Sequence, residues 1–224
     1  MGVAGWAALA SVCFVAALLQ ATSGFGFAVL AVPFFLLLAP PDQTVRLIVV
    51  ISLATSLFVM PGLYRSVDGP LLVRLTLGSL VALPLGLFLF THTAPLVVRF
   101  AAGGIVTFFA AMLGWQRRHG QGAPLTLRPM RDVAVGAVAG VATALVGMAG
   151  PPVLIYLLLG GAPMRTVRAT LIAFFALVYA ATLFANAVAI GMGAEIWVLA
   201  ASLLPFVWLG GRIGLRVGER LATR

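Results

Sequence analysis

The sequence predicts an all-α integral membrane protein built from two inverted repeats of about five helical segments each. Three observations carry this prediction: an apolar composition, an internal similarity between the two halves, and arginines gathered at the ends of apolar runs. Apolar residues make up 62% of the 224 residues, charged residues make up 8%, and the mean hydropathy is +1.16. A soluble domain is usually about one-quarter charged. Too few polar groups are present to cover a core, so the apolar surface must face lipid.

Nine uncharged apolar runs follow one another along the chain and are expected to form its helical segments. Short joints rich in Gly, Pro and polar residues separate them, such as 39–42 and 68–70. The one extended polar stretch, 116–132, is expected to be a basic cytoplasmic loop between a first membrane repeat at 1–115 and an incomplete second repeat at 133–224. The runs cover residues 2–20, 24–39, 47–63, 75–91, 100–115, 133–147, 151–161, 169–191 and 196–211.

The two halves resemble each other at an offset of 121 residues, which indicates an internal duplication. Gly26 aligns with Gly147 at this offset. One inserted residue later, Thr44-Val45-Arg46 aligns with Thr166-Val167-Arg168. The second half has no counterpart of the 100–115 run, so the last helix of the second repeat is expected to be absent.

Each repeat is expected to open with a broken-helix hairpin. The stretch from Val133 to Leu159 would form a helix of about 40 Å, too long for one upright crossing and too short for two. The segment Gly147–Pro152 interrupts it with two successive prolines, which lack amide donors and clash with the preceding turn. By analogy, the first repeat is assigned a hairpin of its own, from the runs 2–20 and 24–39.

The placement of the arginines predicts the membrane topology. All fourteen basic residues are arginines, and the net charge is +9. If the segment 133–161 returns to its starting side, only Arg46 and Arg99 lie on the face opposite the other twelve. The positive-inside rule then predicts a cytoplasmic C-terminus and an outer N-terminus in the inner membrane. Five segments per repeat invert the second copy, an architecture typical of transporters with their site at broken helices near the midplane.

Few side chains are available for catalysis, metal binding or proton transfer. The chain has neither Gly-x-Ser-x-Gly nor His-Glu-x-x-His, and His92 and His119 lie outside the span centres. Cys13 is the only cysteine, which excludes an intrachain disulfide and a cysteine-based metal site. All five acidic residues lie at predicted span ends, so no proton-carrying carboxylate is expected inside the membrane. We therefore expect no enzyme activity, no cofactor and no metal.

Two glycine-rich motifs resemble those of a known family. Ser23-Gly24-Phe25-Gly26-Phe27-Ala28-Val29-Leu30-Ala31-Val32-Pro33 is similar to the opening of the TauE/SafE family, the sulfite exporter or sulfonate permease group. Gly147-Met148-Ala149-Gly150-Pro151-Pro152-Val153, followed by Arg168-Ala169-Thr170, is similar to its second-half counterpart. The resemblance covers nearly the whole chain and implies transport of sulfite, sulfoacetate or other organosulfonates across the cytoplasmic membrane. Two departures are Phe27-Ala28, where more glycine is common, and the lack of the further C-terminal helix usual in the family.

The glycines at the two breaks, Gly24, Gly26, Gly147 and Gly150, are the first candidates for substrate binding. A helix that starts inside the membrane presents free backbone N–H groups and the positive end of its dipole, which suits an anion. Pro151 can start such a helix without losing a useful donor. The alternative interpretation is that these glycines only permit close helix packing.

Polar and charged side chains supply the other candidates. Gln20 and Ser23 precede the first break and can donate to sulfonate oxygens, or can bond to carbonyls freed by the break. Arg46 and Arg168 occupy matching repeat positions and can attract or gate an anion, or can extend to lipid headgroups instead. Asn186, deep in an apolar span, can contact substrate or make an interhelical hydrogen bond. Further potential donors are Thr22, Tyr156 and Tyr179.

Together these features predict a secondary transporter for a small sulfur-containing anion. Its expected partners are that anion and the lipid bilayer, without nucleic acid, because the arginines mark span ends and do not form a groove-binding face. A homo-oligomer is left open. A non-transporting membrane scaffold or assembly protein and an anion channel are the alternatives. The scaffold leaves the two matching breaks unexplained, and saturable flux with counterflow distinguishes a carrier from a channel.

Overall fold

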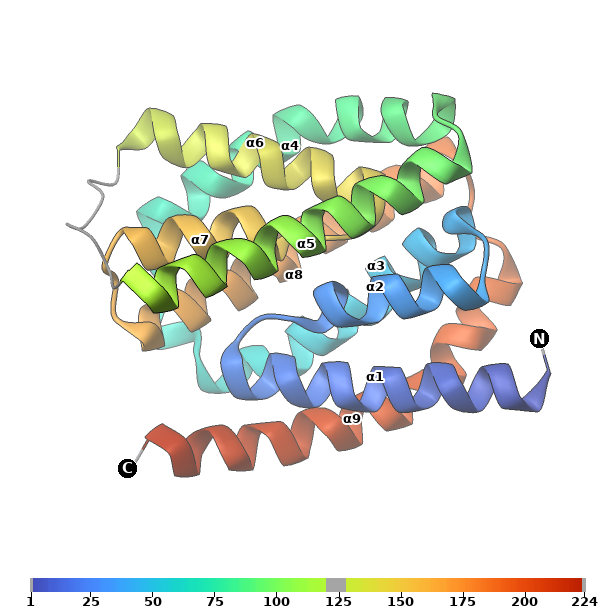
Figure 1. Ribbon diagram of the computed structural model, residues 1–224, viewed down its shortest axis with the longest axis horizontal. Helices are drawn as coiled ribbons and strands as arrows, with labels where there is room; N and C mark the ends of the chain where they lie inside the picture. The colour runs from blue at the N-terminus through green and yellow to red at the C-terminus, as the bar shows by residue number, and fades with distance from the viewer. Residues whose placement is uncertain (1, 120–127, 223–224) are drawn as a thin grey trace.

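The computed structural model describes residues 2–119 and 128–222, which fold into helices joined by short turns (Figure 1). Neither range contains a strand. Seven of the helices are long and apolar enough to cross a bilayer, while α2 and α7 are shorter. The predicted all-α membrane fold is therefore confirmed. The α-helices of the two described ranges are α1 (Val3–Ser23), α2 (Phe27–Leu38), α3 (Pro41–Val59), α4 (Gly69–His92), α5 (Pro95–His119), α6 (Pro129–Val146), α7 (Gly150–Leu159), α8 (Met164–Ala189) and α9 (Ala194–Ala222).

Each predicted apolar run corresponds to one α-helix, but the polar segment 116–132 is helical at both ends. Helix α5 continues to His119, and α6 begins at Pro129. Proline is well suited to the first helical position because its missing N–H has no acceptor there. Residues 120–127, the middle of the predicted loop, lie outside the described part of the chain.

Local sequence signals account for most helix boundaries. Prolines stand in the first turn of α3, α4, α6 and α7. Asp68 caps α4, because its carboxylate accepts a hydrogen bond of 3.1 Å from the Leu71 amide. Helices α1 and α6 both end at a glycine in the left-handed region, Gly24 with φ +88° and Gly147 with φ +76°. A side chain is strained in that conformation, so these glycines end each helix at the predicted break.

Two helix pairs form the sides of the bundle: α1 packs along α9, and α4 packs along α6. Their backbones touch through glycines. A Cβ at Gly140 of α6 would collide with the Ser79 carbonyl of α4, and a Cβ at Gly214 of α9 would approach the Leu18 carbonyl of α1. Without a hydrophobic drive between helices in lipid, such close backbone contact is a main source of helix association.

The pairing is reciprocal between the two halves of the chain. The first helix of each predicted repeat packs on the fourth helix of the other, and α1 and α6 run in opposite directions (Figure 1). Opposite directions of corresponding helices are what inverted repeats require. The inverted-repeat organisation itself stays a prediction, which the reciprocal packing supports.

Helices α3 and α8 pack against each other in the middle of the bundle. In each of these two helices 56% of an 18-residue apolar stretch is buried, against 17% of the corresponding stretch in α5. Large apolar side chains are instead exposed on α4 and α5, among them Val81, Phe88, Phe100 and Phe108. These surfaces face the lipid, and the space between α3 and α8 is the interior of the molecule.

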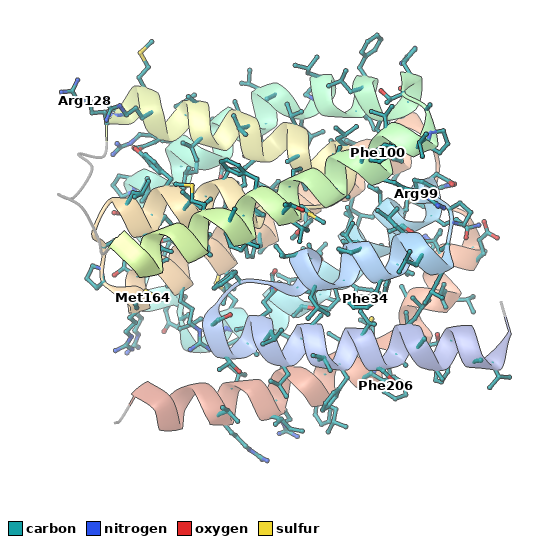
Figure 2. All side chains as sticks on the ribbon, in the orientation of Figure 1. Phe34, Arg99, Phe100, Arg128, Met164 and Phe206 are labelled. Atoms are coloured by element: carbon teal, nitrogen blue, oxygen red, sulfur yellow. The ribbon has the colours of Figure 1, made fainter. Side chains whose placement is uncertain are left out.

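The N-terminus lies at one end of the bundle and the C-terminus at the other, and we call these the N-terminal end and the C-terminal end (Figure 1). The N-terminal end carries Arg46, near the start of α3, and Arg99, near the start of α5. The C-terminal end carries Arg128 and Arg165, which precede α6 and open α8. Arg99 and Arg128 lie at opposite ends in Figure 2. The predicted cytoplasmic C-terminus depends on how the arginines are divided between these two ends.

Candidate functional site

The first break lies between α1 and α2 and is shaped by two glycines with positive φ. Gly24 has φ +88° and Gly26 has φ +110°. The Gly24 amide donates to the Gln20 carbonyl at 2.7 Å. The Ser23 hydroxyl lies within hydrogen-bond distance of two carbonyls, Leu19 at 2.7 Å and Phe25 at 2.8 Å. The Ser23 hydroxyl therefore stabilises this turn. Bonding to carbonyls freed by the break was the alternative to substrate binding for this residue.

Arg168 of α8 covers the first break. Its guanidinium donates to the Ala21 carbonyl in the last turn of α1, and a Cβ on Gly24 would collide with the Arg168 side chain. Glycine is thus required here by close approach as well as by φ. Beside it opens a cavity of about 660 Å³ at the C-terminal end, which we call the C-terminal pocket. Its lining includes Thr22, Ser23, Phe25, Arg165 and Arg168.

The second break, between α6 and α7, is more deeply enclosed than the first. Gly150 and Pro151, at the start of α7, are both buried. A Cβ on Gly147 would lie 3.1 Å from Cγ2 of Ile48 on α3 and 3.9 Å from Cγ2 of Val32 on α2. The Gly147 carbonyl accepts a hydrogen bond of 3.1 Å from the Tyr179 hydroxyl of α8. The break therefore contacts α2, α3 and α8.

Buried polar side chains run along α3 and α8 at helical spacing, and we call them the polar seam. Its members are Thr44, Ser52, Thr55 and Ser56 of α3 with Tyr179, Thr182 and Asn186 of α8. All are at most 2% exposed. Spacings of three and four residues place the members of each helix on one face.

Three members of the polar seam lack a hydrogen-bond partner among the described residues. These are the hydroxyls of Thr44 and Ser52 and both polar atoms of the Asn186 amide. The Ser52 hydroxyl lies beside the Tyr179 hydroxyl, without a hydrogen bond of ordinary length and angle. The hydroxyls of Thr55 and Thr182, by contrast, donate to carbonyls of their own helices at 2.7 Å and 2.8 Å. A buried polar group without a partner destabilises the fold, so these members have hydrogen-bonding capacity left over for a ligand.

Gln20 joins α1 to the polar seam. Its amide donates to the Ser56 hydroxyl at 3.3 Å, and Gln20 is 2% exposed. Of the candidates before the first break, Gln20 thus faces the interior. Ser23 borders the C-terminal pocket instead.

The two breaks lie at different depths. Arg168, which covers the first break, is the fifth residue of α8, and Tyr179, which contacts the second, is the sixteenth. At 1.5 Å per residue, about 16 Å of helix axis separates them. The structure thus brings Ser23, Gly24 and Arg168 together near one end. Gly147, Gly150 and Pro151 gather nearer the middle, with Asn186 two turns beyond Tyr179.

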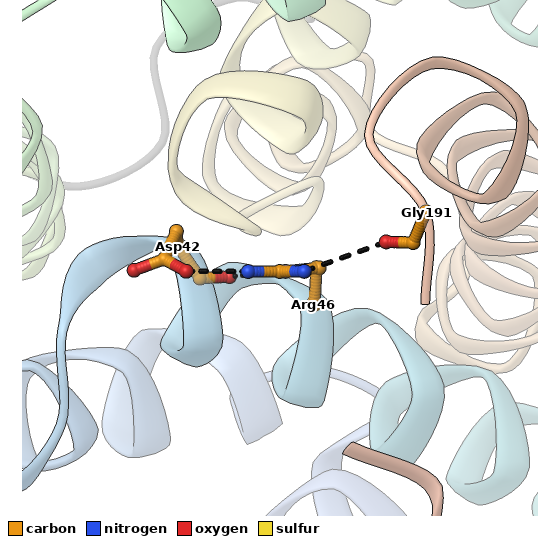
Figure 3. A network of polar contacts seen from close by, with 3 residues as sticks. All are labelled: Asp42, Arg46 and Gly191. Carbon is orange, nitrogen blue, oxygen red and sulfur yellow. Dashed lines mark hydrogen bonds and ion pairs between the residues drawn. The ribbon is translucent and has the colours of Figure 1, made fainter. Parts of the chain in front are cut away.

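Arg46 is placed at the N-terminal end, away from both breaks. It forms an ion pair with Asp42, and its guanidinium donates to the Gly191 carbonyl at 3.4 Å (Figure 3). Its side chain is 14% exposed. These contacts tie the start of α3 to the turn between α8 and α9, so Arg46 holds two elements together where the sequence left gating and lipid contact open.

A family model described as the sulfite exporter TauE/SafE matches residues 9–224, nearly the whole chain. The chain belongs to the TauE/SafE family. The match confirms the predicted family and, with seven apolar helices of spanning length, a multi-pass membrane protein of transport type. The chain matched no curated protein and no solved structure.

The TauE/SafE chain also contains a buried carboxylate, Asp132, whose hydrogen-bonded cluster with two other side chains could not be predicted from the sequence. Asp132 was placed at a span end, yet it is fully buried in the first turn of α6. Its carboxylate accepts from Arg74 of α4 at 2.7 Å and from the Tyr156 hydroxyl of α7 at 2.5 Å. The position of Asp132 at a span end suggested that its side chain would be exposed. No sequence pattern indicates that it pairs with residues on two other helices. The polar seam could have been predicted more readily from the sequence, because Thr44, Ser52 and Ser56 recur at multiples of four residues.

The interior of this TauE/SafE chain offers hydrogen-bond donors, a chemistry that suits an anion. The polar seam offers hydroxyl and amide donors, while Arg165 and Arg168 add positive charge at one end. Asp132 is the one carboxylate among the described side chains that is fully buried, and it is paired with Arg74. Of the described residues, no three His, Cys, Asp or Glu gather as a metal site would require.

Proposed function

We propose that this TauE/SafE protein is a secondary transporter that moves a small sulfur-containing anion, such as sulfite, sulfoacetate or another organosulfonate, across the cytoplasmic membrane. The observation that carries the proposal is the set of unpaired, fully buried side chains in the polar seam: Thr44, Ser52 and Asn186. Each unpaired hydroxyl or amide costs about 1–3 kcal/mol. A bound anion that accepts hydrogen bonds from them removes that cost.

A sulfonate or sulfite matches these donors. The oxygens of a sulfonate or of fully deprotonated sulfite accept hydrogen bonds and donate none, and the unpaired Ser52 hydroxyl and Asn186 amide both carry donors. The first backbone N–H groups of α2, which begins at Phe27, have no partner within their helix. The positive end of that helix adds to the attraction.

The substrate path runs between the two breaks along α3 and α8. At the C-terminal end, Arg165 and Arg168 supply positive charge beside the first break. The path continues past Gln20 to Ser52 and the second break, and then to Asn186. Since no described seam member is a carboxylate, the anion gradient and the membrane potential are the simplest driving force.

A carrier is favoured over an open channel because the polar seam is closed from both ends. Every seam member is fully or almost fully buried, so no continuous opening exposes these groups. A carrier of this kind exposes the path to each side in turn. A scaffold has no use for unpaired donors in its interior.

The test is flux in liposomes containing the purified protein, with radiolabelled sulfite, sulfoacetate and taurine as substrates and succinate and chloride as controls. Ser52→Ala removes an unpaired hydroxyl, so its stability is expected to stay the same or rise, while flux falls at least tenfold. Thr55→Val is the matched control, because the Thr55 hydroxyl is already paired with the Ile51 carbonyl. It is expected to keep most of its flux.

Each outcome of the flux assay decides between the candidates. Saturable flux with counterflow supports the carrier, and flux that does not saturate supports the channel. If folded protein moves none of the anions, the transporter proposal fails and the scaffold takes its place. If Ser52→Ala transports as well as Thr55→Val, the polar seam is not the substrate path.

A further inference from the structure

The N-terminal end of the bundle contains a second large cavity, of about 650 Å³, which we call the N-terminal pocket. It is bordered by the turn between α2 and α3, the turn between α4 and α5, and the end of α8. Most of its wall is apolar: Leu37, Leu38, Phe90, Val98 and Ile190 contribute side chains. Sequence reasoning did not identify a site here, because three separate turns build it.

Arg99 is the basic residue in the wall of this pocket. Its side chain is exposed at the N-terminal end (Figure 2), and no described residue forms a hydrogen bond or ion pair with it. Asp42 also borders the pocket, but its carboxylate is paired with Arg46 (Figure 3). The charge left without a partner in the N-terminal pocket is therefore positive.

A cation beside an apolar wall suits an anion that carries a short hydrocarbon group. Arg99 can form paired hydrogen bonds with two sulfonate oxygens, and the apolar wall covers the carbon atoms. The volume falls in the usual range for small-molecule sites, about 300–1,000 Å³. Bare sulfite uses Arg99 but leaves the apolar wall uncovered.

We infer that the N-terminal pocket binds organosulfonates with a short apolar group, with Arg99 holding the sulfonate, and serves as the transporter's access site on that side. The inference rests on the proposed function, because it names the substrate class. It also predicts different selectivity at the two ends. The lining of the C-terminal pocket contains two arginines, Arg165 and Arg168, whereas Arg99 is the one arginine lining the N-terminal pocket.

The experiment measures binding separately from transport. The protein is placed in nanodiscs of phosphatidylcholine, and methanesulfonate, butanesulfonate, hexanesulfonate and sulfite are titrated by calorimetry. Affinity is expected to rise roughly fourfold for each added CH₂ until the wall is covered. Arg99→Gln is expected to weaken butanesulfonate binding by about tenfold or more, and Arg99→Lys is expected to restore part of it.

Arg65→Gln is the matched control, because Arg65 is exposed at the opposite end and lies over the Tyr64 ring. It is expected to leave binding unchanged. Thermal unfolding of all variants verifies that the fold is intact. Affinity that depends neither on chain length nor on Arg99 overturns the inference.

An anionic phospholipid offers the same chemistry, a charged head above an apolar chain. Repeating the titration in nanodiscs with phosphatidylglycerol separates the two sources. If the lipid displaces hexanesulfonate through Arg99, and hexanesulfonate inhibits no flux, the pocket is a lipid site and the inference is wrong. Binding that requires Arg99 without any flux defeats the transporter proposal alone. Flux without such binding defeats the pocket alone.

Discussion

At the residue scale, Asp132 shows how one side chain can hold three helices. It lies in the first turn of α6 and is bonded to Arg74 of α4 and to Tyr156 of α7. Helix α7 is the short arm of the second break. The cluster thereby fixes the short arm to the α4–α6 pair and keeps the break in place beside the polar seam.

Removing Arg74 leaves a buried carboxylate without its ion partner. Arg74→Gln is expected to destabilise the protein by about 2 kcal/mol, less than a fully buried pair because the Arg74 side chain is 34% exposed. Tyr156→Phe, which removes one hydrogen bond to a charged group, is expected to destabilise the protein by about 1.5–3 kcal/mol. Thermal unfolding in detergent measures both, and Arg65→Gln is the control. Equal unfolding temperatures for Arg74→Gln and Arg65→Gln contradict the assigned role of the cluster.

Residue-scale prediction from the sequence worked where backbone geometry decided the outcome. Gly24, Gly26 and Gly147 were identified from glycine-rich breaks, and all three have positive φ. It was incomplete where the outcome depended on a partner from another helix. Arg46 forms an ion pair with Asp42 and a hydrogen bond to the Gly191 carbonyl, and the Ser23 hydroxyl bonds to carbonyls near its own turn. Those contacts compete with substrate binding and cannot be read from residue type.

At the element scale, helix pairs depend on small residues that let backbones touch. Gly136 and Gly140 of α6 lie against backbone carbonyls of α4, and Gly210 and Gly214 of α9 lie against those of α1. The same device serves both pairs. These glycines contact the backbone of a neighbouring helix, whereas the break glycines Gly24 and Gly147 lie against side chains and have positive φ.

A large side chain at one of these contacts is expected to separate the pair. Gly140→Leu should prevent stable folding, seen as loss of a monodisperse peak in detergent size-exclusion chromatography. Gly103→Leu is the matched control, because nothing lies within 4 Å of its Cβ position on α5. It should fold normally, since leucine favours a helix over glycine by up to about 1 kcal/mol. Normal folding of Gly140→Leu would show that the α4–α6 contact is not essential.

At the scale of the whole molecule, the two halves exchange their first helices, and this exchange places the predicted path in the centre. Helices α1 and α6 each pack on the far half, which leaves α3 and α8 enclosed. Large apolar side chains such as Val81 and Phe108 cover the outside. The bundle thus has an apolar surface for lipid and polar groups inside, the reverse of a soluble protein.

The division of arginines between the two ends predicts which end faces the cytoplasm. In a Cys13→Ala background, Ala94→Cys marks the N-terminal end and Met130→Cys, at a position 86% exposed, marks the C-terminal end. A membrane-impermeant maleimide added to intact cells is expected to label Ala94→Cys alone. Met130→Cys should react only after permeabilisation. Labelling of both from the same side contradicts the topology.

The sequence by itself determined the fold class, the family, the helices and the positions of the two breaks. It could do so because a bilayer imposes its length and apolarity on every span, and because glycine and proline act on their own backbone. The tertiary structure decided which polar groups are paired and which are left for a ligand. Asp132 acquires Arg74, Ser52 and Asn186 acquire no described partner, and three turns together form a pocket around Arg99. These outcomes depend on which helix faces which, and such packing contacts join residues that are distant in the chain.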